Sequence, residues 1–257
     1  MLRDIFRYRD LVLTLVAREL KVRYRRSVIG FLWTMLQPLL MMLVFYMVFS
    51  QLFRSNLPHY PVYALAGILF WNFFSQSIVA SMNSLRGNAQ LLQKLPVPKA
   101  VFPIATVISG VVNLVFALVP TLLITVAIEH RLSPALLFLP VSILLAALFT
   151  LGAGLLLSPL AVFFTDVVEL VGVLLTVLLY LTPVIYPMNM LPANSRILQV
   201  VRFNPLRSIL EVFRDPIHQG KVPPLAHLAV CVTIAAVALA VGAFAFRRSS
   251  DRIPFYV

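Results

Sequence analysis

Four basic residues, Lys21, Arg23, Arg25 and Arg26, fall just before a run without charge that lasts from Ser27 to Phe53. Arginine has a planar fork of donors that pairs with phosphate oxygens at two points. Three of the four are arginines, so the cluster predicts contact with a phosphorylated lipid headgroup. Simple anchoring to an anionic lipid surface is an equally good interpretation, because basic flanks beside membrane spans are common. Gly30 follows closely and permits a bend in the chain.

Residues for other chemistry are missing from the sequence. There is no G-x-x-x-x-G-K-[ST] motif, so we expect no ATP site of the P-loop kind. The four histidines, at 59, 130, 218 and 227, stand far apart and form no metal-ligand or Ser/His/Asp pattern. We therefore expect no catalytic residue, no metal and no cofactor in this chain.

A short polar segment, SLRGNAQLLQKLPVPKAVFP (residues 84–103), separates two long apolar stretches. Its middle predicts two helical turns that end before Pro96. The leucines would form an exposed apolar face that docks into a partner's groove; the alternative is a plain surface loop. The candidate docking residues are Asn88, Leu91, Leu92, Lys94 and Leu95.

A longer polar segment at 188–223 contains RILQVVRF and PLRSILEVFRDPI. Both have helical spacing of apolar residues, and Asn204 before Pro205 is a good helix entry. We expect two short amphipathic helices that either pack or form a gate over an exit. The candidate gate residues are Arg202, Arg207 and Phe213.

Aromatic residues are frequent in the apolar stretches. Aromatic rings stack on sugars, although most aromatics in membrane proteins serve packing or interfacial belts. The candidates for lining a glycan channel are Trp33, Phe70, Trp71, Phe74, Tyr180 and Tyr186.

Composition decides which elements position these residues. Of the 257 residues, 61% are hydrophobic and only 12% are charged, against about 25% charged in soluble domains. A bilayer needs about 20 apolar residues for a helical span. We expect one all-α membrane domain over 1–257, with six spans at 29–53, 62–84, 101–128, 135–158, 168–187 and 224–246. The segments outside the spans should form an interface helix at 1–26, a cytoplasmic coupling loop at 86–99 and external gate helices at 188–223. The fourth span should end near Pro159.

Basic residues set the orientation. The two termini and the 86–99 loop fall on one side of a six-span chain and carry 14 of the 21 lysines and arginines. The side richer in lysine and arginine is normally cytoplasmic. Both termini are therefore expected in the cytoplasm, with five basic residues of the 188–223 segment, including Arg214, facing outside.

Four blocks resemble the membrane subunit of type-2 ABC exporters, in the branch that exports polyprenol-linked polysaccharides such as O-antigen and teichoic acid. They are RELKVRYRRSVIGFLWTMLQPLL (18–40), QLLQKLPVPKAVFP (90–103), FTDV (164–167) and FNPLRSILEVFRDPI (203–217). Together they extend over nearly the whole chain, and the first block is the most specific.

The resemblance implies a homodimer in the inner membrane of a bacterium, bound to two ABC ATPase subunits that hold ATP and Mg²⁺. The pair Ile29–Gly30 matches a Leu-Gly loop that the family places near the pyrophosphate of the lipid-linked substrate. The diphosphate site would then comprise Arg23, Arg25, Arg26, Ile29 and Gly30. Thr165 departs from the family pattern, in which arginine commonly precedes the aspartate of this turn.

The expected cargo is polysaccharide linked to undecaprenyl diphosphate, as in O-antigen export. Wall teichoic acid and a small lipid or drug are alternative cargoes of the same fold. A membrane enzyme acting on lipids is the alternative of a different class, and the absence of acid, base and metal residues argues against it. No nucleic-acid partner is expected.

Overall fold

The computed structural model describes residues 8–23, 25, 29–49, 60–94, 97–129, 133–190, 192, 196–253 and 256. Every regular element in these ranges is a helix. In chain order they are α2 (Arg9–Arg23), η1 (Gly30–Leu32), α3 (Trp33–Phe49), α4 (Tyr60–Gly87), α5 (Ala89–Lys94), α6 (Val101–Glu129), η2 (Pro134–Phe138), α7 (Leu139–Phe163), α8 (Val167–Leu181), η3 (Met188–Met190), α9 (Arg196–Phe203), α10 (Pro205–His218) and α11 (Leu225–Ser250).

The all-helical class is confirmed across these ranges. Four helical segments are long and apolar enough to cross a bilayer: α4, α6, the continuous η2–α7 segment and α11. The helices at the first and fifth expected spans are shorter, with 17 residues in α3 and 15 in α8. At 1.5 Å per residue these cover about 25 and 22 Å, less than the roughly 30 Å of a hydrocarbon core. The count of six spans therefore stays a prediction.

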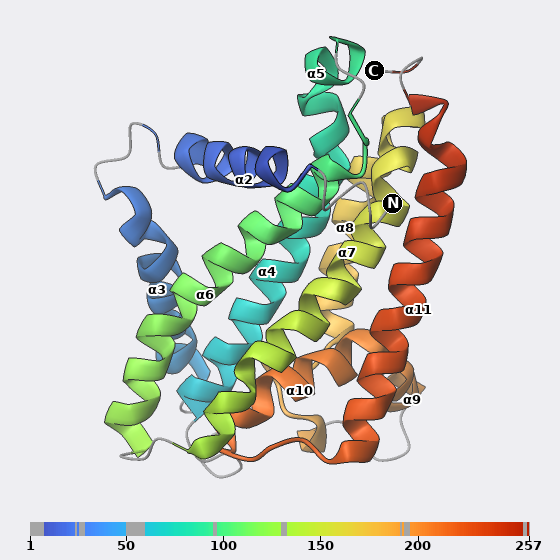
Figure 1. Ribbon diagram of the computed structural model, residues 1–257. Coiled ribbons are helices and arrows are strands. Elements are labelled where there is room, and N and C mark those ends of the chain that lie inside the picture. Colours follow the sequence, from blue (N-terminus) through green and yellow to red (C-terminus); the bar gives the residue numbers. More distant parts are fainter. Residues whose placement is uncertain are drawn as a thin grey trace.

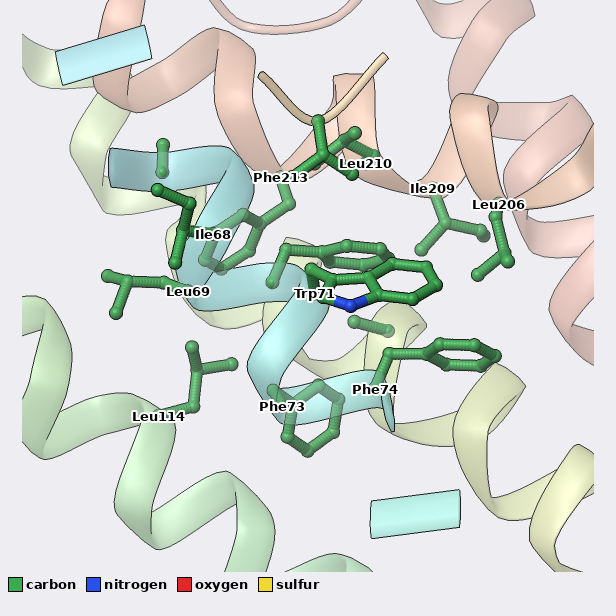
Figure 2. Packing of buried hydrophobic residues seen from close by; sticks show 14 of the residues in the cluster. Ile68, Leu69, Trp71, Phe73, Phe74, Leu114, Leu206, Ile209, Leu210 and Phe213 are labelled. Carbon is green, nitrogen blue, oxygen red and sulfur yellow. The ribbon is translucent and has the colours of Figure 1, made fainter. Parts of the chain in front are cut away.

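The long helices form a bundle around α4 (Figure 1). Most of α4 is buried, and α3, α6, α7 and α10 pack against it. The α2 helix lies across the end of the bundle where α4 ends and α6 begins, and α10 fills the opposite end. Figure 2 shows α4 and α10 side chains meeting in the core, where Trp71 lies near Ile209 and Leu206.

Small residues allow two helix backbones to touch. A Cβ added to Gly242 of α11 would clash with the backbone of Gly152 of α7, and one added to Gly152 would clash with Ala238. Small residues at these positions therefore permit close packing of α11 against α7.

Two expectations about helix ends met different outcomes. The fourth span was predicted to end near Pro159, whereas the helix α7 continues to Phe163; where the span ends in the membrane stays a prediction. The proline removes one backbone hydrogen bond, but Ala161 and Val162 beyond it are buried and favour continuation of the helix.

The two short helices expected in 188–223 are present as α9 and α10, and Asn204 caps α10 by accepting a hydrogen bond from the Leu206 amide at 3.0 Å.

Candidate functional site

The α2 helix is fixed to the bundle by its apolar side and by two polar contacts. Val12, Leu15 and Val16 are buried in a cluster with residues of α5 and α6. Thr106 donates a hydrogen bond to Glu19 at 3.0 Å, and Arg18 donates one to the Asn88 side-chain oxygen at 3.1 Å. These contacts hold the basic C-terminal end of α2 beside the start of α6.

Lys21 and Arg23 lie in the last turn of α2 and are exposed. Positive charge there is favoured by the partial negative charge at a helix C-terminus. Arg25 is exposed on the turn that follows, and Arg26 lies outside the described residues. The cluster is therefore placed at the end of the bundle, with side chains available to a ligand.

Gly30 makes the bend between α2 and α3. Its φ is +57°, in the left-handed region that favours glycine. An added Cβ would meet nothing within 4 Å, so backbone conformation, rather than crowding, is what requires the glycine. The expected bend at Gly30 is confirmed, while close approach of a phosphate to it stays a prediction.

A cleft of about 310 Å³ lies between α3, α4 and α6, and Arg23, Gly30 and Trp33 line its end near α2. A neighbouring cleft of about 360 Å³ also includes Arg23, together with Arg18 and Glu19. Arg25 and Ile29 are exposed nearby and do not line either cleft. The structure thus brings three predicted residues to one cleft, with a guanidinium that can pair with anionic oxygens.

The coupling segment forms the short helix α5, as expected. The prediction that its leucines are exposed is wrong for Leu92, which is 7% exposed, and Leu91 packs against the same cluster. The physical reason is that these leucines pack into a cluster with apolar residues of α2, α4 and α6. Gln90 and Lys94 are exposed instead, Asn88 binds Arg18, and Leu95 lies outside the described residues.

The six aromatic candidates fall into three places. Phe70, Trp71 and Phe74 are buried in the core, and Figure 2 shows Trp71 and Phe74 among the packed side chains. Phe70 meets the gate candidate Phe213 with ring centroids 5.8 Å apart. This position favours the packing interpretation for these four. Trp33 is half exposed at the cleft. Tyr180 is exposed in the last turn of α8, and its carbonyl accepts a hydrogen bond at 2.7 Å from the hydroxyl of Tyr186, which follows that helix.

The remaining gate candidates do not form one site. Arg202 is exposed on α9. Arg207 on α10 pairs with Glu211 at 2.7 Å, and Glu211 also lies 3.8 Å from His227 of α11. One turn further along α10, burial raises the pKa of Asp215 to about 6, and the neighbouring Glu211 adds to this effect. Asp215 therefore takes up a proton at a higher pH than an exposed aspartate does.

Arg214 is buried, although it was expected among the basic residues on the outer side of the membrane. Only 4% of it is exposed, and the side of the membrane on which it lies stays a prediction. Its guanidinium donates to the carbonyls of Pro183 at 2.9 Å and Val184 at 2.7 Å, and lies 3.8 Å from the centre of the Tyr63 ring. The signal was present in the sequence: Arg214 is four residues after Leu210 and therefore falls within the apolar stripe of its helix.

The surroundings explain why a charge is tolerated there. The α8 helix ends at Leu181, so the carbonyls that follow need donors. Tyr63 donates to the Tyr186 carbonyl at 3.1 Å, and Asn204 donates to the Leu181 carbonyl at 3.1 Å. A side chain at Gly67 would clash with Arg214 and Val184. Together with Arg214 these residues fasten the end of α8 to α10 and α4.

Comparisons with known proteins agree on one kind of molecule. The family model described as ABC-2 type transporter matches residues 10–217. The O-antigen export system permease protein RfbA of Myxococcus xanthus is 31% identical over 239 residues, covering 93% of this chain and 92% of that protein. An RfbA permease of Klebsiella pneumoniae is 29% identical over 82% of this chain and 81% of that protein. The polysialic acid transport protein KpsM of Escherichia coli is 24% identical over 92% of both chains.

Proposed function

The chain belongs to the ABC-2 type transporter family, and from this premise we propose that it is the permease subunit of a bacterial polysaccharide exporter. Its cargo is a polysaccharide of the O-antigen kind linked to undecaprenyl diphosphate, which enters from the cytoplasmic leaflet and crosses the inner membrane. The relatives named for O-antigen and polysialic acid export match over most of their length, which supports a polysaccharide over a small lipid or drug.

Energy comes from a separate subunit in this proposal. The sequence has no P-loop motif, so two ABC ATPase subunits bind ATP and Mg²⁺ and drive a homodimer of this chain. They dock at the end of the bundle that carries α5. Both termini face the cytoplasm, in accord with the excess of basic residues on that side.

One observation supports the proposal that this chain binds the diphosphate at the lipid end of its cargo. Arg23, Gly30 and Trp33 line one cleft at the junction of α2 and α3. A guanidinium beside a bend in the backbone suits a diphosphate, and an interfacial tryptophan suits the lipid boundary. Wall teichoic acid carries the same lipid diphosphate and is the alternative cargo.

Deletion of the gene from its host tests the proposal. We expect surface polysaccharide to disappear while polyprenyl-diphosphate-linked polysaccharide accumulates in the cytoplasm, and a plasmid copy should restore export. Normal surface polysaccharide in the deletion strain would contradict the proposed function. Loss of synthesis, with no accumulation inside, would instead favour a membrane enzyme of lipid chemistry.

A further inference from the structure

The cleft beyond Arg23 is lined by amides and hydroxyls rather than by charges. Within the described residues that line it, Arg23 is the only charged one. The polar lining residues are Thr34 and Gln37 on α3, Asn72, Gln76 and Ser77 on α4, and Thr106 and Asn113 on α6. From Thr106 to Asn113 the lining descends about 10 Å along α6, toward the middle of the bundle.

Ser77 provides a second, independent observation. It is 3% exposed, and its hydroxyl has no hydrogen-bond partner among the residues that the structure describes. A buried polar group without a partner is costly. A Cβ at Gly110 would clash with this hydroxyl, so the glycine keeps the space beside it free of side chains. A ligand hydroxyl in the cleft would give Ser77 its missing partner.

The hydrogen-bonding groups of the lining residues favour one class of ligand. Amide side chains both donate and accept hydrogen bonds, as sugar hydroxyls require. A metal cation prefers carboxylate ligands, which the described lining lacks, and a lipid chain would leave the amides unsatisfied. Trp33 and Phe73 add flat apolar faces. The volume of about 310 Å³ is at the lower end of small-molecule sites and suits a sugar unit rather than a polymer.

We propose that this cleft binds the first sugar of the lipid-linked polysaccharide, directly beyond the diphosphate held near Arg23. The inference rests on the proposed function and deepens it. The permease then recognises the reducing end of its cargo by two adjoining groups of residues, a basic one for the diphosphate and an amide one for the sugar.

The experiment compares two lipids that differ by one sugar. Equilibrium binding to the purified permease–ATPase complex in nanodiscs is measured for undecaprenyl diphosphate and for undecaprenyl diphosphate carrying one N-acetylglucosamine. We expect wild type to bind the sugar-bearing lipid about tenfold more tightly, the gain that one or two net hydrogen bonds provide. The double variant Asn72→Leu and Gln76→Leu should bind both lipids equally, with affinity for the bare diphosphate unchanged.

Two further variants make the comparison specific. Ser77→Ala removes only the unpartnered hydroxyl and should lower the gain about threefold, even if the double variant fails to assemble. Asn83→Leu is the matched control, because Asn83 is on α4 outside the cleft and donates to its own helix at Val79. It should keep the wild-type gain.

The outcomes separate this inference from the proposed function. An undiminished sugar gain in the double variant and in Ser77→Ala would overturn the sugar site. Equal binding of the two lipids by wild type would also overturn it, while leaving a lipid-diphosphate exporter in place. Failure of wild type to bind either lipid would overturn the proposed function itself.

Discussion

At the scale of residues, two interpretations of the arginines at and just beyond the end of α2 can be separated by experiment. Lysine can replace arginine as a positive charge at a helix C-terminus or at an anionic surface. It cannot reproduce the two-point pairing of a guanidinium with a diphosphate. The choice between an anchor and a binding site therefore depends on how the cluster responds to lysine.

We predict that changing Arg23, Arg25 and Arg26 together to lysine leaves membrane insertion and assembly intact but lowers export about tenfold or more. Surface polysaccharide is measured at equal amounts of permease in the membrane, together with the ATPase rate of the complex. Export at the wild-type level would leave only the electrostatic anchor. Loss of insertion would make the cluster a topology signal.

Arg214 belongs to the same scale, and its role is structural. Arg214→Met would leave the carbonyls of Pro183 and Val184 without their donor in a buried place. Each lost hydrogen bond to a charged group is worth about 1.5–3 kcal/mol. We predict a fall of about 3 kcal/mol or more in the free energy of unfolding, read as a lower melting temperature of the complex. Arg202→Met, on the exposed side of α9, is the control, and equal melting of the two variants would contradict the role given to Arg214.

At the scale of elements, α5 presents a polar surface because its leucines pack inward. Aspartate at Leu92 would disturb the fold as well as any partner, so docking is better tested from the exposed side. We predict that Gln90→Glu with Lys94→Glu weakens capture of the ATPase subunit by the tagged permease about tenfold, without altering permease yield. The matched control is Asn83→Glu on α4. Undiminished capture would place the ATPase elsewhere on the molecule.

The placement of α9 and α10 on the outer side is also testable. The protein has one cysteine, Cys231, which is buried. A cysteine at Ser208 of α10 should react with a membrane-impermeant thiol reagent added outside intact cells, and a cysteine at Gln90 of α5 should react only after the cells are opened. The reverse labelling pattern would overturn the orientation.

At the scale of the whole molecule, the sequence was sufficient for the helical class, the two short helices before α11 and the bend at Gly30. Each rests on local rules: apolar runs, helix-entry residues and the conformational freedom of glycine. Burial of Leu92 could not be read with the same rules, because it packs in a cluster with residues of α2, α4 and α6 that are distant in sequence. The apolar stripe of α10 indicates that Arg214 is buried, but its partners are carbonyls beyond the end of α8 that only the fold brings to it. The continuation of α7 past Pro159 depends likewise on burial by neighbours.

The lining of the cleft likewise depends on contacts between residues that are distant in sequence. Arg23 and Gly30 were predicted as parts of one diphosphate site, and Trp33, close to them in sequence, as a glycan-channel candidate. Asn72, Ser77 and Asn113 come from two other helices and meet them only in the folded bundle. Asn72 and Gln76 are four residues apart on α4, and Thr106 and Asn113 are seven apart on α6, so helical spacing places each pair on one face. Only the packing of α4 against α6 shows that the two faces line the same cleft. A single sequence therefore indicates the basic part of the site and leaves its amide part to the structure.

The measurement that tests the central claim most directly is transport by the purified permease and its ATPase in proteoliposomes. Undecaprenyl-diphosphate-linked polysaccharide is supplied on the ATP side, and its arrival on the other side is followed with an impermeant glycosidase. We predict that the polysaccharide becomes accessible only when ATP, the ATPase and this chain are all present, and that the triple lysine variant transports it poorly. Polysaccharide that stays protected with all three present, or that crosses equally well without this chain, would contradict its role as the export permease.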